Sequence, residues 1–174
     1  MREILFRGKR KDNGEWVYGY LVKYISNNII FIFTKAEREQ VRYIEGKPFY
    51  TEYLTKYEVI PETVGQYTGL QDKTGKKIFE GDIVEMYYDN DKPKRHIVFF
   101  LISSAKFIAT PIKEYLEYMY FLEHRNEYYK YPDYKKSNEI HIKNTGKTPN
   151  SYEAVIIGNR FDNPELLEET KDVN

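Results

Sequence analysis

Cysteine is absent from this chain of 174 residues. Disulfide bonds, thiolate nucleophiles and cysteine-based zinc sites are therefore excluded. Long apolar runs are absent as well: the stretch at 29–33 is only strand-sized, and the N-terminus has no run long enough for a signal peptide. We therefore expect a soluble cytoplasmic protein that does not contact a membrane.

An excess of charge of either sign is also missing, because 27 Lys and Arg residues balance 27 Asp and Glu residues. Proteins that bind nucleic acid over their whole surface normally carry a basic excess. The balance argues against such a protein, although it leaves room for a local basic patch.

Nucleotide-binding loops are lacking too. Gly75 and Lys76 follow Gly69 at a distance that resembles a phosphate-binding loop, but residue 77 is lysine where that loop needs a hydroxyl. The segment is also typical of a hairpin rather than of a strand-to-helix turn. We predict no nucleotide binding there.

The residues that could support metal or acid–base chemistry are poorly placed for it. The three histidines lie far apart in sequence, without the short spacing that pre-positions metal ligands. Glu80 and Asp82 flank a glycine, as acids at a catalytic bend do, but the sequence favours an Asp82 carboxylate that binds nearby backbone amides. We predict no catalytic residue, no metal and no cofactor. The histidines are His96, His124 and His141.

Aromatic residues are abundant, with 18 tyrosines and ten phenylalanines, and they gather in segments that are typical of β-strands. Strands are predicted at 4–8, 15–22 and 29–33, with an Asn-Gly turn between the first two. Residues 35–40 are expected to form a helical turn or a charged loop. Further strands are predicted at 49–54, 58–61, 64–70, 77–79, 83–88, 96–102, 106–109, 139–142 and 153–159.

Helices are expected at only two places. Thr110 and Pro111 can open a helix that continues to about residue 123, although tyrosines in this segment leave a strand as the alternative. A second, short helix is predicted from residue 162, with Asn163 as its cap and Pro164 in its first position. The predicted fold class is all-β, an antiparallel meander that closes toward a small barrel and carries one or two short helices.

Three blocks of sequence support a resemblance to a known family: residues 2–8, residues 64–84, and residues 155–167 without 160 and 161. In this order they resemble the YopX-like proteins of bacteriophages and prophages. The resemblance implies a small, mainly β, phage-encoded protein, oligomeric and without catalytic residues. We predict one domain over 1–174, with a tyrosine-rich insertion at 110–150.

The residues that carry this motif are interpreted as structural, because the glycines fall where the chain bends and the short polar residues fall in turns. The motif residues are Gly65, Gln66, Tyr67, Thr68, Gly69, Asp72, Gly75, Gly81, Asp82, Gly158, Asn159, Asn163 and Pro164.

A candidate binding surface lies near the N-terminus, where residues 1–23 contain six basic and three acidic residues. Aromatic side chains on the following strand could stack on bases, so single-stranded nucleic acid is one predicted partner. The residues of this surface are Arg7, Lys9, Arg10, Lys11, Trp16 and Tyr18.

Binding to protein is the favoured interpretation, because the aromatic residues that dominate protein interfaces are so numerous here. Residues 153–174 carry two basic and six acidic residues, so the oppositely charged ends could pair within or between chains. We therefore predict a non-enzymatic phage or prophage accessory protein that binds or self-assembles. Its predicted partner is a second copy or another protein, and single-stranded nucleic acid is the alternative.

Overall fold

The computed structural model describes residues 3–24, 29–34, 37–87, 92–102, 105–124 and 153–168. They divide into two compact units, Met1–Tyr67 and Thr68–Asn174, which are described separately. Antiparallel strands make up most of both, which confirms the predicted all-β class. The prediction of one domain over 1–174 stays a prediction.

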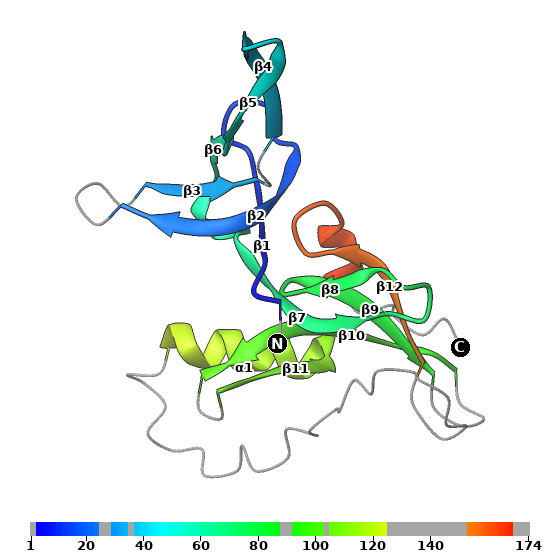
Figure 1. The fold of residues 1–174 in the computed structure, drawn as a ribbon. Coiled ribbons are helices and arrows are strands. Elements are labelled where there is room, and N and C mark those ends of the chain that lie inside the picture. Colours follow the sequence, from blue (N-terminus) through cyan, green and yellow to red (C-terminus); the bar gives the residue numbers. More distant parts are fainter. Residues whose placement is uncertain are drawn as a thin grey trace. The chain divides into compact units, whose positions relative to one another are not determined.

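The first unit is a meander of short strands (Figure 1). Its strands are β1 (Phe6–Lys9), β2 (Trp16–Lys23), β3 (Ile30–Phe33) and β6 (Lys56–Glu58), in the order β6-β3-β2-β1. The start of β7 (Gly65–Gln71) pairs with the other edge of β1. The predicted strands at 4–8, 15–22 and 29–33 are confirmed to within two residues at each end.

Strand β2 belongs to two ladders, since its first half pairs with β1 and its second half pairs with β3. The sheet curls around buried Ile32 and Val59, and a Cβ atom added at Gly8 would lie 3.1 Å from that of Val59. The end of β1 returns to the end of β6 through one isolated bridge, Arg10 to Val59. The predicted small barrel is wrong, because a single bridge does not form a closing ladder and the described strands remain open sheets.

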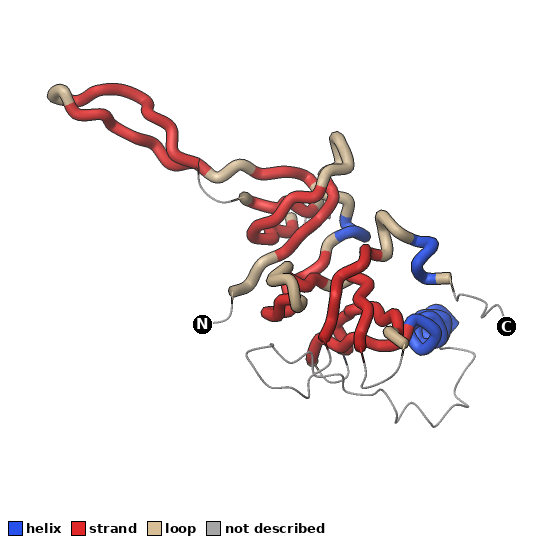
Figure 2. The backbone as a smooth tube through the Cα atoms, turned by 90° about the vertical axis from the view of Figure 1, so that its right-hand side faces the viewer, coloured by secondary structure: helices blue, strands red, loops and turns tan. Residues whose placement is uncertain are grey.

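Residues 37–53 form a hairpin instead of the helical turn or charged loop predicted for 35–40. Strands β4 (Glu37–Ile44) and β5 (Lys47–Tyr53) pair only with each other among the described residues. The turn uses positive φ angles at Glu45 (50°) and Gly46 (74°), which suit the right-handed twist of a hairpin. Figure 2 shows this hairpin extending beyond the other strands of its unit.

The second unit contains a four-stranded sheet in the order β11-β10-β9-β12. Its strands are β9 (Asp82–Tyr87), β10 (Lys94–Leu101), β11 (Lys106–Pro111) and β12 (Glu153–Asn159), and β12 matches the predicted closing strand. The rest of β7 pairs with β8 (Lys77–Phe79) as predicted. Helix α1 (Ile112–His124) resolves the alternative in this segment in favour of a helix, but Thr110 and Pro111, predicted to open it, belong to β11.

Two elements cover opposite faces of this sheet. On one face, Ile78 of β8 packs into a core of Val84, Met86, Val98, Ala109 and Ala154. On the other face, the Phe99 ring lies 5.3 Å from that of Tyr115 and 5.6 Å from that of Tyr118, both on α1. Successive residues of a strand point to opposite faces, so adjacent Val98 and Phe99 tie the sheet to both layers.

Short 3₁₀ helices occur at η1 (Pro61–Thr63) and η3 (Pro164–Leu167). The predicted strand at 139–142 and most of the predicted insertion lie outside the described residues. Within the part of the chain that the structure describes, no helix has the length and apolar character to span a membrane.

Candidate functional site

The motif predicted from sequence is built around the carboxylate of Asp72, at the turn between β7 and β8. Its Oδ1 accepts hydrogen bonds from the Thr74 amide (2.8 Å), the Thr74 hydroxyl (2.7 Å) and the Lys76 amide (3.0 Å). Its Oδ2 accepts one from the amide of Ile156 on β12, 3.1 Å away. Asp72 therefore closes its own turn and fastens that turn to a strand 84 residues later in the chain.

The charge of Asp72 is maintained by these donors. Burial on its own raises the pKa of this carboxyl, because an anion loses hydration. The hydrogen bonds from Thr74, Ile156 and Lys76 outweigh burial and lower the pKa below its usual 3.8. The side chain is therefore an ionised structural anchor at neutral pH, with both oxygens occupied.

The bend between β8 and β9 is likewise held from several directions. Gly81 adopts a φ of 85°, which favours glycine. Its amide donates to the Val98 carbonyl (2.7 Å), and its carbonyl accepts from the Arg160 amide (3.0 Å). Asp82 is buried and accepts from the Phe79 amide at 2.8 Å, as predicted for this aspartate.

Glu80, the other acid at the bend, accepts instead from the Phe100 amide at 3.3 Å. The two carboxylates thus serve different strands.

The second part of the motif is a tight turn after β12. Asn159 Oδ1 accepts from the amides of Phe161 (2.9 Å) and Asp162 (3.0 Å). Asn163 occupies the N-cap position of the following 3₁₀ helix, with Pro164 in the first position as predicted, but its Oδ1 accepts from the Asn159 amide and makes no capping hydrogen bond. A Cβ atom at Gly158 would lie 2.5 Å from that same oxygen, so a larger residue there would have to displace the Asn163 side chain from this turn.

The remaining motif residues complete the strand pairing. Gly65 and Gln66 lie opposite Arg7 and Phe6 of β1. The Tyr67 amide donates to the Leu5 carbonyl. The structure places the other motif residues in the β7–β8 hairpin and at the start of η3: Thr68, Gly69, Gly75 and Pro164.

His96 is buried on β10, an inner strand of the four-stranded sheet. Its Nδ1–H donates to the Lys94 carbonyl at 2.9 Å. Burial above all lowers the pKa of His96 below 6.5; the hydrogen bond opposes this effect, and the charge of Lys94 adds to it. The described residues contain no group of three or more His, Asp or Glu side chains that could hold a metal ion.

The candidate binding surface of the first unit separates into two parts. Four of its six residues lie on one side of the sheet, because the register places Arg7 opposite Tyr18 and Lys9 opposite Trp16. We call this side the outer face. It consists of Arg7, Lys9, Trp16, Tyr18, Tyr20, Val22, Tyr24, Phe31, Phe33, Lys56 and the acid Glu58.

Cations of the outer face lie against its aromatic rings. The Arg7 guanidinium is 4.7 Å and the Lys9 ammonium 5.6 Å from the centre of the Trp16 ring. The Lys56 ammonium is 5.0 Å from the centre of the Phe31 ring. Cations at such distances are attracted to the ring face, so the outer face combines positive charge with aromatic surface.

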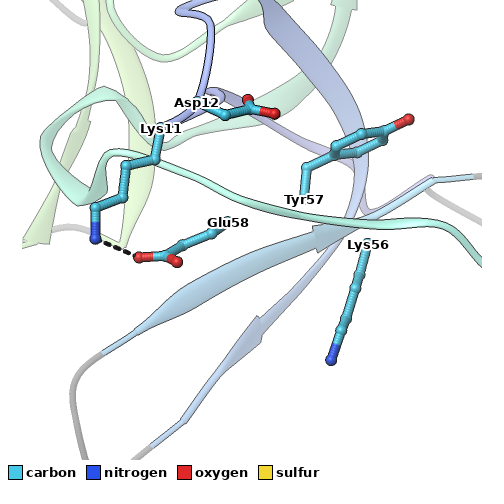
Figure 3. Close-up of a pocket in the computed structure, with 5 residues that line it drawn as sticks. All are labelled: Lys11, Asp12, Lys56, Tyr57 and Glu58. Atoms are coloured by element: carbon cyan, nitrogen blue, oxygen red, sulfur yellow. Dashed lines mark hydrogen bonds and ion pairs between the residues drawn. The ribbon is translucent and has the colours of Figure 1, made fainter.

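The other two predicted residues, Arg10 and Lys11, are engaged by acids. The Arg10 guanidinium lies 4.3 Å from the Tyr57 ring centre and binds Asp12. Lys11 donates to Glu58 at 2.6 Å, and both residues line a cavity of about 280 Å³ together with Asp12, Lys56 and Tyr57 (Figure 3). This cavity is an open pocket of mixed charge.

The sequence interpretation missed the exposed apolar side chains of the β4–β5 hairpin. Tyr43, beside the turn, is 67% exposed, and Ile44, Tyr53 and Leu54 are exposed as well. The available signal was the Glu45-Gly46 pair between two segments that contain tyrosine. The alternating charges at 37–39 made the first of those strands, β4, resemble a charged loop in the sequence.

Comparison with known proteins identifies one family. The family model described as YopX protein matches residues 5–168. The chain also resembles a crystal structure of protein EF1440 from Enterococcus faecalis, with 22% identity and a TM-score of 0.51 over 97% of this chain and 100% of that one. That likeness concerns the fold. Curated proteins yield no match.

Proposed function

The chain belongs to the YopX protein family, and from that premise we propose that it is a non-enzymatic module that self-assembles through its β4–β5 hairpin. We place it, by resemblance, among phage or prophage accessory proteins of the host cytoplasm. The acids of its central motif already accept backbone hydrogen bonds, which supports a structural rather than a catalytic role for them.

The hairpin is the observation that carries this proposal. Two-stranded hairpins are marginally stable in water unless a further element covers them, and β4 and β5 pair only with each other within the described ranges. Four large apolar side chains are nevertheless exposed on the hairpin or directly after it: Tyr43, Ile44, Tyr53 and Leu54. Contact with another chain would remove this apolar area from water.

A second copy is the occupant that fits this surface. Residues 37–54 carry three basic and four acidic residues, so two hairpins can approach without strong repulsion. Closed two-fold contacts are the commonest symmetric arrangement of identical chains. Pro48 and the irregular pairing between Gln40 and Arg42 interrupt the strand edges, so we expect side-chain packing rather than a continuous intermolecular sheet.

Sedimentation velocity of the full chain over a range of micromolar concentrations tests the proposal. We expect a concentration-dependent dimer. The double variant Tyr43→Ser, Ile44→Ser should weaken dimerisation at least about tenfold, because about 1.4 kcal/mol of lost apolar burial corresponds to that factor.

Ile102→Ser is the matched control, since Ile102 is 80% exposed in the second unit and its change leaves the hairpin intact. Circular dichroism would verify that each variant is folded. A chain that stays monomeric at high micromolar concentration would refute self-assembly. A double variant that dimerises as strongly as wild type would refute the role of the hairpin.

A further inference from the structure

The outer face of the first unit is distinct from the hairpin and has a different chemical character. Its tyrosines follow one another along β2 and beyond it: Tyr18, Tyr20 and Tyr24 are all exposed, and Tyr20 is 60% exposed. Tyr24 packs edge-on against Phe31 of β3 at 5.4 Å, which steadies one ring and leaves part of it accessible. The face therefore presents a row of aromatic rings to solvent.

The spacing of this row follows from strand geometry. Alternate residues of a strand point to the same side and lie about 6.6 Å apart. Tyr18 and Tyr20 are thus separated far enough for each ring to stack on a different planar group. Stacking on successive aromatic rings is how many proteins hold unpaired bases without reading their sequence.

Positive charge accompanies the rings. Arg7, Lys9 and Lys56 belong to this face, and its acid, Glu58, is ion-paired to Lys11 at 2.6 Å, so three cations face one acid that already has a cationic partner. Positive charge beside exposed rings complements a chain that alternates phosphates with bases. The near-neutral hairpin offers no such complementarity.

We infer that the outer face binds single-stranded nucleic acid, with bases stacked on Tyr18, Tyr20 and Tyr24 and phosphates near Lys9 and Lys56. Arg7 is buried against Trp16. Its charge therefore attracts phosphates at a distance and does not contact them directly. With two phosphate contacts, from Lys9 and Lys56, the logarithm of the affinity should fall with the logarithm of salt concentration at a slope of about −1.4.

Fluorescence anisotropy of labelled oligo(dT), about 16 nucleotides long, titrated with the full chain at low and physiological salt tests the inference. We expect binding that weakens as salt rises. Tyr20→Ala should weaken it about tenfold, the loss expected for one base–aromatic stack. Lys56→Gln should reduce the salt slope by about 0.7, the contribution of one phosphate contact.

Tyr120→Ala is the matched control, because Tyr120 is 53% exposed on α1 and outside the outer face, and it should bind oligo(dT) like wild type. Absence of binding at low salt, or equal affinity for Tyr20→Ala and wild type, would overturn the inference. A Tyr20→Ala variant that alters sedimentation while oligo(dT) stays unbound would identify a protein interface instead. The sedimentation experiment on the Tyr43→Ser, Ile44→Ser variant tests self-assembly independently of these oligo(dT) results.

Discussion

At the scale of single residues, Asp72 joins parts of the chain that are remote in sequence. Ala154 and Ile156 lie on the outer edge of β12, where a further strand would otherwise pair. The Ala154 carbonyl accepts from the Lys73 amide at 3.1 Å, and the Ile156 amide donates to Asp72. The turn therefore occupies the hydrogen-bonding groups of an edge strand, which protects that edge from pairing with other chains.

Two substitutions of Asp72 should separate its role in closing the β7–β8 turn from its role in fastening that turn to β12. Asp72→Ala leaves several partly buried donors without an acceptor and should lower the free energy of unfolding by about 2–3 kcal/mol. Asp72→Asn keeps one acceptor oxygen for the turn but turns an amide toward the Ile156 amide, so it should be intermediate. Urea unfolding of both variants, with exposed Asp12→Asn as control, measures this order. An Asn variant as stable as wild type would contradict the link to β12.

The same side chain predicts a dependence on acid. Its folded-state pKa lies below the ordinary 3.8, so its contribution to stability is complete above that pH and is lost as pH falls through the lower folded value. The difference in unfolding free energy between wild type and Asp72→Asn should therefore shrink between pH 7 and pH 3. A constant difference over this range would contradict an ionised anchor.

His96 predicts a dependence at milder pH. Its folded-state pKa lies below 6.5, so the unfolded chain binds a proton first and stability falls as pH decreases below 6.5. The contribution of this residue to the slope of the unfolding free energy against pH cannot exceed about 1.4 kcal/mol per pH unit. His96→Asn, which retains a donor for the Lys94 carbonyl, should flatten the curve between pH 7 and pH 5. In NMR spectra the His96 ring should be less than half protonated at pH 6.5, and half-protonation there would refute the burial argument.

At the scale of elements, the β4–β5 hairpin depends on an unusual turn residue. Glu45 has a φ of 50°, a region that asparagine tolerates better than glutamate and that β-branched residues avoid. Glu45→Asn should slow amide hydrogen exchange in β4 and β5, whereas Glu45→Val should accelerate it. The strands of the second unit serve as an internal reference. Equal exchange in both variants would show that the turn does not limit hairpin stability.

Elements with strong local signals were predictable from sequence. Runs such as Ile30–Phe33 and Glu153–Asn159 combine β-branched or aromatic residues with bounding turns, and both are strands. Strand β4 was missed because Glu37, Arg38 and Glu39 have little strand preference, and pairing with β5 overrides it. Whether the sheet closes into a barrel could not be predicted from local sequence either, because closure depends on whether strand edges that are distant in sequence form a ladder.

The candidate site followed the same pattern. Asp82 was predicted correctly because its partner lies only three residues away. The contact of Asp72 with Ile156 spans 84 residues, and no local pattern encodes it. Arg10 and Lys11 were predicted to belong to the binding surface, whereas the fold gives them Asp12 and Glu58 as partners.

At the scale of the whole molecule, each unit has a core of its own. Ile32 and Val59 are fully buried in the first unit, and Ile78, Val84 and Val98 are fully buried in the second. The second core packs a sheet between a hairpin and a helix, whereas the first lies inside one curled sheet. Smaller cores bury a smaller share of their surface, so the first unit should open more readily.

Matched core truncations can test whether the units open separately. Val59→Ala and Val84→Ala remove the same two methyl groups from fully buried positions, and each should destabilise its own unit by about 2 kcal/mol. In native-state hydrogen exchange, Val59→Ala should accelerate β2 and β3 while β9 and β10 keep wild-type rates, and Val84→Ala should do the reverse. If either variant accelerates exchange equally throughout, the chain unfolds as one cooperative domain, because local openings in a single unit cannot share one free energy.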